Sequence, residues 1–208
     1  AKPCAPHRRR WVARKSPVVP IESLASGDVN SLYTSKGVKG RVVLPDSSIV
    51  TLNSDSRITY PAKFAGSTRE VDFTGEAYFQ VRKDSLMPMV IHCDRNFDIK
   101  VFGTTFNVKS YKDDRDAVTT LVEGNVKVVQ NLDGKEIITN IKPNESCVIS
   151  KDGVAKVETY KDPKEKYAWK DGRLIFDSTP LEDAIVILER WHGVDFELLD
   201  PSKKDMSI

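Results

Sequence analysis

Residues 71–81 read VDFTGEAYFQV, and the alternation of their side chains decides the fold class of this chain. Apolar side chains occupy most of the odd positions, namely Val71, Phe73, Ala77, Phe79 and Val81. This period of two is typical of a β-strand with one apolar face and one polar face. Gly75 interrupts the alternation, and a glycine inside a strand indicates a bulge or the close approach of another backbone.

The same arrangement recurs twice further along the chain. Residues 99–108 (IKVFGTTFNV) contain Gly103, and residues 119–128 (TTLVEGNVKV) contain Gly124. Short strands separated by turn residues continue over residues 37–160, which predicts a mainly β body. Three strand–glycine–strand units in succession leave two architectures open, a twisted β-sandwich or a β-solenoid-like stack of repeats.

The period changes to that of a helix near the C-terminus. Residues 178–183 (STPLED) predict a helix start, with a hydroxyl N-cap, a proline in the first turn and acids near the positive end of the helix dipole. An apolar helical face follows, and Gly193 is placed to end the helix. Strand-like stretches at 169–176 and 194–198 flank it, so we expect a small βαβ piece after the β body.

Composition limits the classes of function. The chain has 208 residues, 39% of them apolar, which is enough for a sizeable core. Its net charge of +2, with 30% charged residues, gives no reason to expect nucleic acid as a partner. No run of 18 apolar residues predicts a membrane helix. Residues 1–36, rich in arginine and proline at their start, are interpreted as an N-terminal arm or linker, with room for a short strand or helical turn in 21–36.

Three cysteines, Cys4, Cys93 and Cys147, are widely spaced. An odd number without close spacing argues against a disulfide framework, so buried thiols are expected for the latter two. One disulfide between Cys93 and Cys147 stays open as an alternative. A metal site built from His92 and these cysteines would lack a fourth ligand.

Motifs of catalysis are missing from the sequence. It contains no GxSxG, no GxxxxGK[ST] and no HExxH. Glu76, beside Gly75 in the strongest motif, is the one acid considered as a catalytic candidate. We expect it instead on the solvent face of its strand, paired with Arg69 or Arg82 or bonded to a neighbouring turn. The chain is therefore predicted not to be an enzyme, and no cofactor or metal is expected.

Four blocks of sequence resemble, in order and spacing, the FecR-type regulators, which are inner-membrane anti-sigma proteins of Gram-negative bacteria. The blocks are VVLPDSSIVTLNSDSRITYP (42–61), VDFTGEAYFQV (71–81), VFGTTFNV (101–108) and LVEGNV (121–126). The motif residues that carry the resemblance are Arg69, Gly75, Glu76, Phe79, Val81, Gly103, Thr104, Phe106, Val108 and Gly124. The family's usual Leu-Pro-Asp-Gly-Thr reads Leu44-Pro45-Asp46-Ser47-Ser48 here, a departure within a turn.

The resemblance implies a domain organisation and a location. Residues 37–160 would form a FecR-like all-β domain. Residues 161–208 would be the first half of an α+β signalling domain similar to the secretin and TonB short N-terminal domain. An unfinished unit leaves apolar area uncovered, at about 1.5–3 kcal/mol per large side chain. We therefore expect the tail to dock on the β body, to pair with another chain, or to fray. The chain would lie on the periplasmic side of the inner membrane, without the family's membrane helix and cytoplasmic domain.

The resemblance also implies a function. The chain would be a periplasmic sensor that relays a signal from an outer-membrane TonB-dependent transporter to an extracytoplasmic-function sigma factor. The transporter's N-terminal signalling domain would be one partner, and the sigma factor would be reached through the absent cytoplasmic domain. No nucleic acid or small-molecule substrate is expected. The residues expected to frame the partner surface are Leu174, Phe176, Leu181, Ile185 and Leu188.

Two other functions remain open from the sequence. A periplasmic carbohydrate-binding or carbohydrate-active β protein would require a groove with clustered acids and exposed aromatic side chains. A structural protein that self-assembles through its sheet edges would show a concentration-dependent size.

Overall fold

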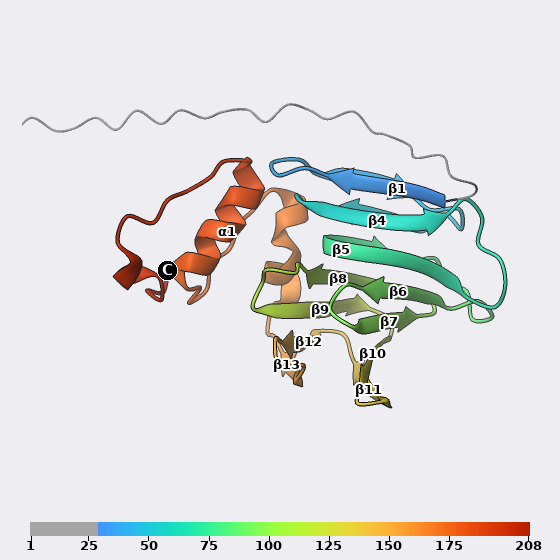
Figure 1. The fold of residues 1–208 in the computed structure, drawn as a ribbon. Coiled ribbons are helices and arrows are strands. Elements are labelled where there is room, and N and C mark those ends of the chain that lie inside the picture. Colours follow the sequence, from blue (N-terminus) through green and yellow to red (C-terminus); the bar gives the residue numbers. More distant parts are fainter. Residues whose placement is uncertain (1–28) are drawn as a thin grey trace, which may run out of the picture.

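The structure is a computed structural model that describes residues 29–208 (Figure 1). The predicted arm over residues 1–28, with Cys4, lies outside the described residues. The described chain forms β1 (Val29–Thr34), β2 (Gly40–Val43), β3 (Ile49–Leu52), β4 (Ser56–Pro61), β5 (Arg69–Gln80), β6 (Met89–Cys93), β7 (Phe97–Val101), β8 (Thr105–Ser110), β9 (Asp116–Glu123), β10 (Val126–Leu132), β11 (Lys135–Ile141), β12 (Glu145–Ser150), β13 (Ala155–Thr159), η1 (Pro163–Asp171), α1 (Leu181–His192) and η2 (Pro201–Lys203). The prediction of a mainly β fold is confirmed.

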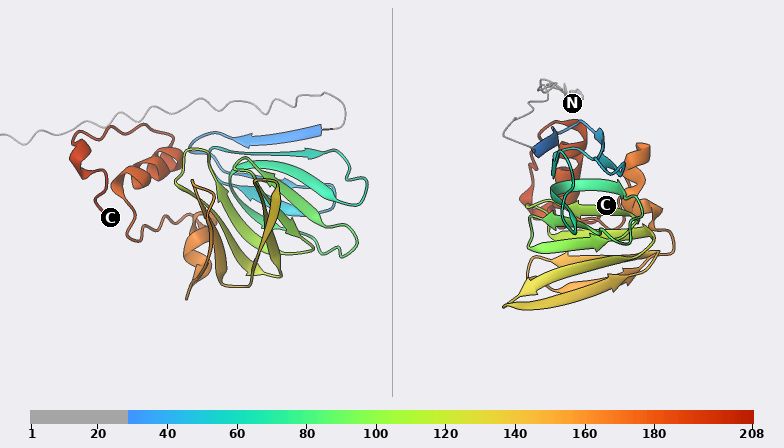
Figure 2. Two further views of the ribbon diagram at one scale, coloured as in Figure 1. Left: turned by 60° about the horizontal axis from the view of Figure 1, so that its bottom comes forward. Right: turned by 90° about the vertical axis from the view of Figure 1, so that its right-hand side faces the viewer.

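Strand β5 is shared by two sheets. Its first half pairs with β4 and β6, and its second half pairs with β3 and β8. From β5 the first sheet continues through β6, β7, β10 and β11, and the second through β8, β9, β12 and β13. β1 pairs with β4, so the β body begins before residue 37. The two halves fold onto one another as a nearly closed, barrel-like sheet around one core (Figure 2).

The pairing pattern decides between the two predicted architectures. Among the strand pairs of residues 29–159, β5–β6 is parallel and all the others are antiparallel. A solenoid would stack successive repeats as parallel neighbours. The solenoid-like alternative is therefore wrong, and the observed body is a twisted sheet that folds onto itself and nearly closes like a barrel.

The odd-numbered side chains of β5 point into the core, as the alternation predicted. Val71, Phe73, Ala77 and Phe79 are all buried. The ring of Phe79 stacks on Phe106 of β8 at a centroid distance of 5.0 Å and meets Phe73 edge-on at 5.6 Å. Burial of such side chains contributes about 1.5–3 kcal/mol each, so these rings join the two sheets firmly.

Gly75 lies where β5 passes from the first sheet to the second. Its φ of +105° is in the region that favours glycine, and an added Cβ would lie 2.3 Å from Ser56 Oγ. The Ser56 hydroxyl accepts a hydrogen bond from the backbone N–H of Glu76 at 2.8 Å. The glycine predicted as a close backbone approach therefore allows β4 and β3 to pair with one continuous strand.

Arg69 begins β5 as a buried cation. Its Nη1 lies 2.5 Å from Asp46 Oδ2 and donates to the carbonyl of Arg82 at 3.0 Å, while Nε donates to the carbonyl of Met87 at 2.8 Å. Asp46 belongs to the β2–β3 turn, where Ser47 has a φ of 70°. That is the left-handed conformation for which the family's glycine is suited, so the sequence departure in this turn carries backbone strain.

The strands predicted around the C-terminal helix are absent from the described residues, which corrects the βαβ expectation. Residues 163–171 form η1, whose first turn is capped by the Asp162 side chain, and Tyr167 and Trp169 are buried in it. Residues 194–198 lie outside any helix or strand. Neither stretch has a neighbouring strand to pair with, so the local alternation is not enough to make a strand.

Helix α1 begins and ends close to the predicted residues, but its N-cap is different. Gly193 closes the helix at a φ of 64°, as predicted. The hydroxyl N-cap prediction is wrong, because Pro180 occupies the cap and no side chain caps the helix. The first free N–H groups instead donate to carbonyls of the following chain, from Leu181 to Met206 and from Glu182 to Lys204, both at 2.9 Å.

Cys93 and Cys147 are free and buried, which confirms the prediction of buried thiols and not the alternative disulfide. Burial raises the pKa of the Cys147 thiol to about 11, and burial also raises the pKa of Cys93 well above its usual value.

We expect Gly75→Ala to destabilise the protein more than Gly134→Ala does. Both glycines have positive φ, so each change costs about 1–2 kcal/mol of backbone strain. Nothing lies within 4 Å of an added Cβ at Gly134, whereas the methyl group at position 75 collides with Ser56. Urea unfolding should show an additional loss of about 1–3 kcal/mol for Gly75→Ala. Equal losses for the two variants would contradict the proposed role of this close contact.

Candidate partner-binding surface

The C-terminal segment, residues 163–208, docks on the β body, one of the three expected outcomes. Its 3₁₀ helix η1 packs on the outer face of the second sheet, where the Tyr167 ring lies 5.4 Å from the Tyr78 ring of β5. Trp169 Nε1 donates a hydrogen bond to Asn107 Oδ1 of β8 at 3.0 Å. Figure 1 shows α1 on the far side of η1, at one end of the strands.

Glu76 lies buried beneath this segment. Its carboxylate accepts hydrogen bonds from Asn53 Nδ2 at 2.7 Å and from Asn107 Nδ2 at 3.1 Å, and the residue is 8% exposed. The expected solvent-facing position and the pairing with Arg69 or Arg82 are wrong, because η1 covers this face of β5. The expected bond to a neighbouring turn is present, since Asn53 directly follows β3.

Both amide partners of Glu76 are fixed in orientation. Asn53 Oδ1 accepts the backbone N–H of Ser54 at 2.9 Å, and Asn107 Oδ1 accepts the indole N–H of Trp169. Each amide therefore presents its N–H to Glu76, which matches a carboxylate that only accepts. The two asparagines and Lys109 lower the pKa of Glu76, whereas burial raises it by a larger amount. The pKa of Glu76 is therefore raised overall.

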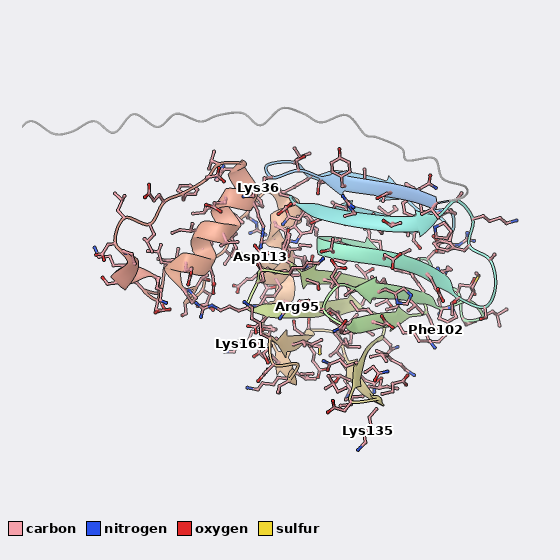
Figure 3. The ribbon with its side chains drawn as sticks, in the orientation of Figure 1. Lys36, Arg95, Phe102, Asp113, Lys135 and Lys161 are labelled. Atoms are coloured by element: carbon pink, nitrogen blue, oxygen red, sulfur yellow. The ribbon has the colours of Figure 1, made fainter. Side chains whose placement is uncertain are left out.

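Arg190 joins α1 to the loop between β8 and β9. This buried guanidinium donates to Asp114 Oδ1 at 2.7 Å and to Asp113 Oδ1 at 2.6 Å, and lies 3.7 Å from the centroid of the Tyr111 ring. Lys109 Nζ lies 2.7 Å from the other oxygen of Asp114. We call Arg190, Asp113, Asp114 and Tyr111 the Arg190 cluster; Figure 3 labels Asp113 between α1 and the strands.

The loop between β1 and β2 holds the C-terminal end of α1. The backbone N–H of Gly37 donates to the carbonyl of Arg190 at 2.6 Å. Lys39 Nζ lies 3.5 Å from the centroid of a Trp191 ring and donates to the carbonyl of Trp169 at 2.8 Å. Lys36, labelled at this junction in Figure 3, lies 3.9 Å from Glu189. The helix is thus held mainly by polar and cation–π contacts.

A cavity of about 160 Å³ lies between the β body and the C-terminal segment. Cations outnumber acids in its lining, which includes Glu76, Lys109, Lys166, Arg173 and Arg190. The carbohydrate hypothesis requires clustered acids and exposed aromatic side chains. This cavity does not have the first, and among its aromatic lining residues Tyr111 and Trp169 are buried and Trp191 is covered by Lys39.

The apolar side chains of the C-terminal segment are only partly covered. Ala184 is the one fully buried apolar residue of α1. All five residues predicted to frame a partner surface are half-buried: Leu174, Phe176, Leu181, Ile185 and Leu188. The same segment also contains more exposed apolar side chains, including Ile175 at 43% and Leu199 at 72% exposure. We call this set the apolar surface of the C-terminal segment.

Comparison with known proteins identifies the chain. The family model for FecR protein matches residues 30–127, and the model for the FecR C-terminal region matches residues 173–208. Two crystal structures of a candidate anti-sigma factor from Parabacteroides distasonis ATCC 8503, at 2.50 Å and 1.65 Å resolution, match with a TM-score of 0.79 and 30% identity. Each match covers 86% of this chain and 82% of the other.

The chain belongs to the FecR family of anti-sigma factors. None of the curated proteins searched matches it. Within residues 29–208, no helix has both the length and the apolar character required to cross a membrane. In the same range, no three His, Cys, Asp or Glu side chains are grouped so as to hold a metal ion.

The motif residues of this FecR chain lie in three places. Phe79, Val81, Phe106 and Val108 are in the core, and Arg69, Gly75 and Glu76 fix the course of β5. Gly103, Thr104 and Gly124 lie together at one end of the second sheet, where Thr104 Oγ1 donates to the carbonyl of Asn125 at 3.0 Å. An added Cβ at Gly124 would lie 3.0 Å from the carbonyl oxygen of Gly103, so two of the glycine turns pack directly on one another.

Several residues that hold the C-terminal segment of this FecR chain were not singled out from the sequence. Asn53, Asn107, Asp113, Asp114 and Arg190 become neighbours only in the folded chain. The one feature of the sequence that could have pointed to these contacts is Arg190, a cation in the last turn of an apolar helix. That position is also favourable for the helix dipole, so it does not reveal a buried ion pair.

We expect Arg190→Met to release α1 from the β body. Removing one partner of a buried ion pair costs about 3–5 kcal/mol, because Asp114 remains buried without its cation. Amide exchange should accelerate across residues 181–208 and stay slow in β5 and β8. Arg173→Met, at an exposed position of the same segment, serves as the matched control. Unchanged exchange in α1 would show that the Arg190 cluster does not hold the helix.

Glu76 should make a pH-dependent contribution to stability. Its pKa in the folded protein is raised above the ordinary value of 4.5, so the folded state binds the proton more tightly than the unfolded state does. The stabilisation is present below pH 4.5 and is lost as pH rises through the raised pKa. The difference in unfolding free energy between wild type and Glu76→Gln should therefore fall with rising pH. Glu70→Gln, on the exposed side of β5, is the control, and a flat difference for Glu76→Gln would contradict the assignment.

Proposed function

We propose that this chain is the periplasmic sensor module of a FecR-type regulator that relays a signal from an outer-membrane TonB-dependent transporter to an extracytoplasmic-function sigma factor. Membership of the FecR family supports the regulatory role. The observation that carries the proposal is the apolar surface of the C-terminal segment. Its side chains stay half-exposed although α1, which contributes several of them, is docked on the β body. Apolar side chains gathered in one segment and left half-exposed are typical of a protein-binding site.

In this proposal the N-terminal signalling domain of the transporter binds the apolar surface. Leu181, Ile185 and Leu188 recur at helical spacing, so a partner groove or sheet can cover them together. Completing their burial supplies a free energy proportional to the apolar area removed from water, at about 25 cal/mol per Å². The domain assignment accompanies this role, with residues 37–160 as the scaffold and residues 161–208 as the receiving part.

The polar attachment of α1 gives the relay a physical route. A partner that binds α1 acts on the helix held by Arg190, and through it on the β8–β9 and β1–β2 loops of the scaffold. A ligand shifts such an arrangement only through a difference in its affinity for two states. The sigma factor is contacted by the family's cytoplasmic domain, on the other side of the membrane from this module.

Isothermal titration calorimetry of this chain against the N-terminal signalling domain of a TonB-dependent transporter encoded beside it tests the proposal. We expect one-to-one binding, and we expect Ile185→Glu to weaken it by about tenfold or more, since a charge is then buried in the interface. Ile138→Glu, on the exposed strand β11, is the matched control and should bind like wild type. Absence of binding, or equal loss in both variants, would contradict the assignment of this surface.

A further inference from the structure

β13 is the last strand of the second sheet and forms a free edge of the β body. It pairs with β12 on one side, and no other strand of residues 29–159 is hydrogen-bonded to its outer side. Lys156, Val157, Glu158 and Thr159 are all exposed. Val157 is 46% exposed and neighbouring Val154 is 49% exposed, so the edge also carries apolar area.

The hydrogen bonds at both ends of β13 fix which of its backbone groups face outwards. The N–H of Ser150 donates to the carbonyl of Val154 at 3.1 Å, and the N–H of Tyr160 donates to the carbonyl of Asn144 at 3.0 Å. Antiparallel pairs alternate between hydrogen-bonded and non-hydrogen-bonded positions. Even-numbered residues of β13 are therefore bonded to β12, and the N–H and C=O groups of residues 155, 157 and 159 point away from it.

We propose that this edge pairs with β13 of a second copy of the chain, antiparallel and about a two-fold axis at Val157. In this register Val157 faces Val157 of the other copy, and Lys156 faces Glu158 in both directions. Val154 lies opposite Tyr160, which places apolar groups together at each end. All three outward-facing residues, 155, 157 and 159, then meet outward-facing residues of the second copy.

The charge pattern selects this register and this partner. A slip of two residues in one direction places Lys156 opposite Lys156, and a slip in the other places Glu158 opposite Glu158. Like charges directly opposite each other destabilise a sheet, whereas opposite charges stabilise it. Lysine on an edge strand by itself discourages pairing. The glutamate two residues later makes the edge complementary to itself, as an interface with two-fold symmetry requires.

β11 forms the corresponding free end of the first sheet and lacks this complementarity. If two copies paired there about Ile138, Lys135 would face Ile141 and Glu136 would face Asn140, so no opposite charges would meet. Figure 3 shows Lys135 at the tip of the β10–β11 hairpin, away from the rest of the body. This edge therefore supplies a control at which the same charge reversal should have no effect.

Sedimentation equilibrium of the 208-residue chain over a range of concentrations and at two ionic strengths tests the proposal. We expect a dimer that weakens with salt, because its specificity rests on exposed ion pairs. Lys156→Glu and Glu158→Lys should each weaken dimerisation by about tenfold, since the two-fold axis doubles each change. The double variant Lys156→Glu/Glu158→Lys should restore it, and Lys135→Glu should leave it unchanged.

Val157→Pro tests the backbone contact independently of charge. The N–H of Val157 points away from β12, so proline removes an intermolecular donor and no bond within the sheet. We expect a monomer whose circular dichroism matches that of the wild type. A wild-type chain that stays monomeric at every concentration would overturn the proposal. A dimer that survives Val157→Pro, or single reversals that the double variant does not rescue, would also overturn it.

Discussion

The fold depends on the passage of β5 between the two sheets, which the contact of Gly75 with Ser56 permits. Because one strand serves both sheets, the rings of Phe73 and Phe79 meet in one core instead of two. The same passage brings Glu76 to the outer face beside Asn53 and Asn107. The course of a single strand thus sets both the core and the polar floor on which the C-terminal segment lies.

The C-terminal segment is attached by a kind of contact that differs from the packing of the core. Arg190, Lys39 and Trp169 hold it through charge-assisted hydrogen bonds, a cation over a ring and an indole N–H. Such buried polar contacts add little net stability, because desolvation offsets much of their attraction, but they demand one geometry. The helix is therefore well positioned although much of its apolar side stays accessible, which suits the partner-binding role that we propose for it.

Much of the β body could be predicted from the sequence, because a period of two along β5 reports directly on which side chains enter the core. The end of α1 at Gly193 could be predicted for a similar reason, since the left-handed conformation that ends the helix depends on one residue. The burial of Glu76 was not predictable in this way, because η1, about ninety positions further along the chain, covers it. The alternation around Trp169 had also predicted a strand where the structure has this helix. The N-cap was missed for a similar reason, as carbonyls of Lys204 and Met206 took the place of a side-chain oxygen.

Each of the two sheets contains one buried thiol. Cys93 ends β6 in the first sheet, and Cys147 lies in β12 of the second. Thiolates, not thiols, attack alkylating reagents, and burial keeps both groups protonated at neutral pH. An alkylating reagent should therefore modify each cysteine only when that part of the barrel opens, so the two thiols report separately on the opening of the two sheets.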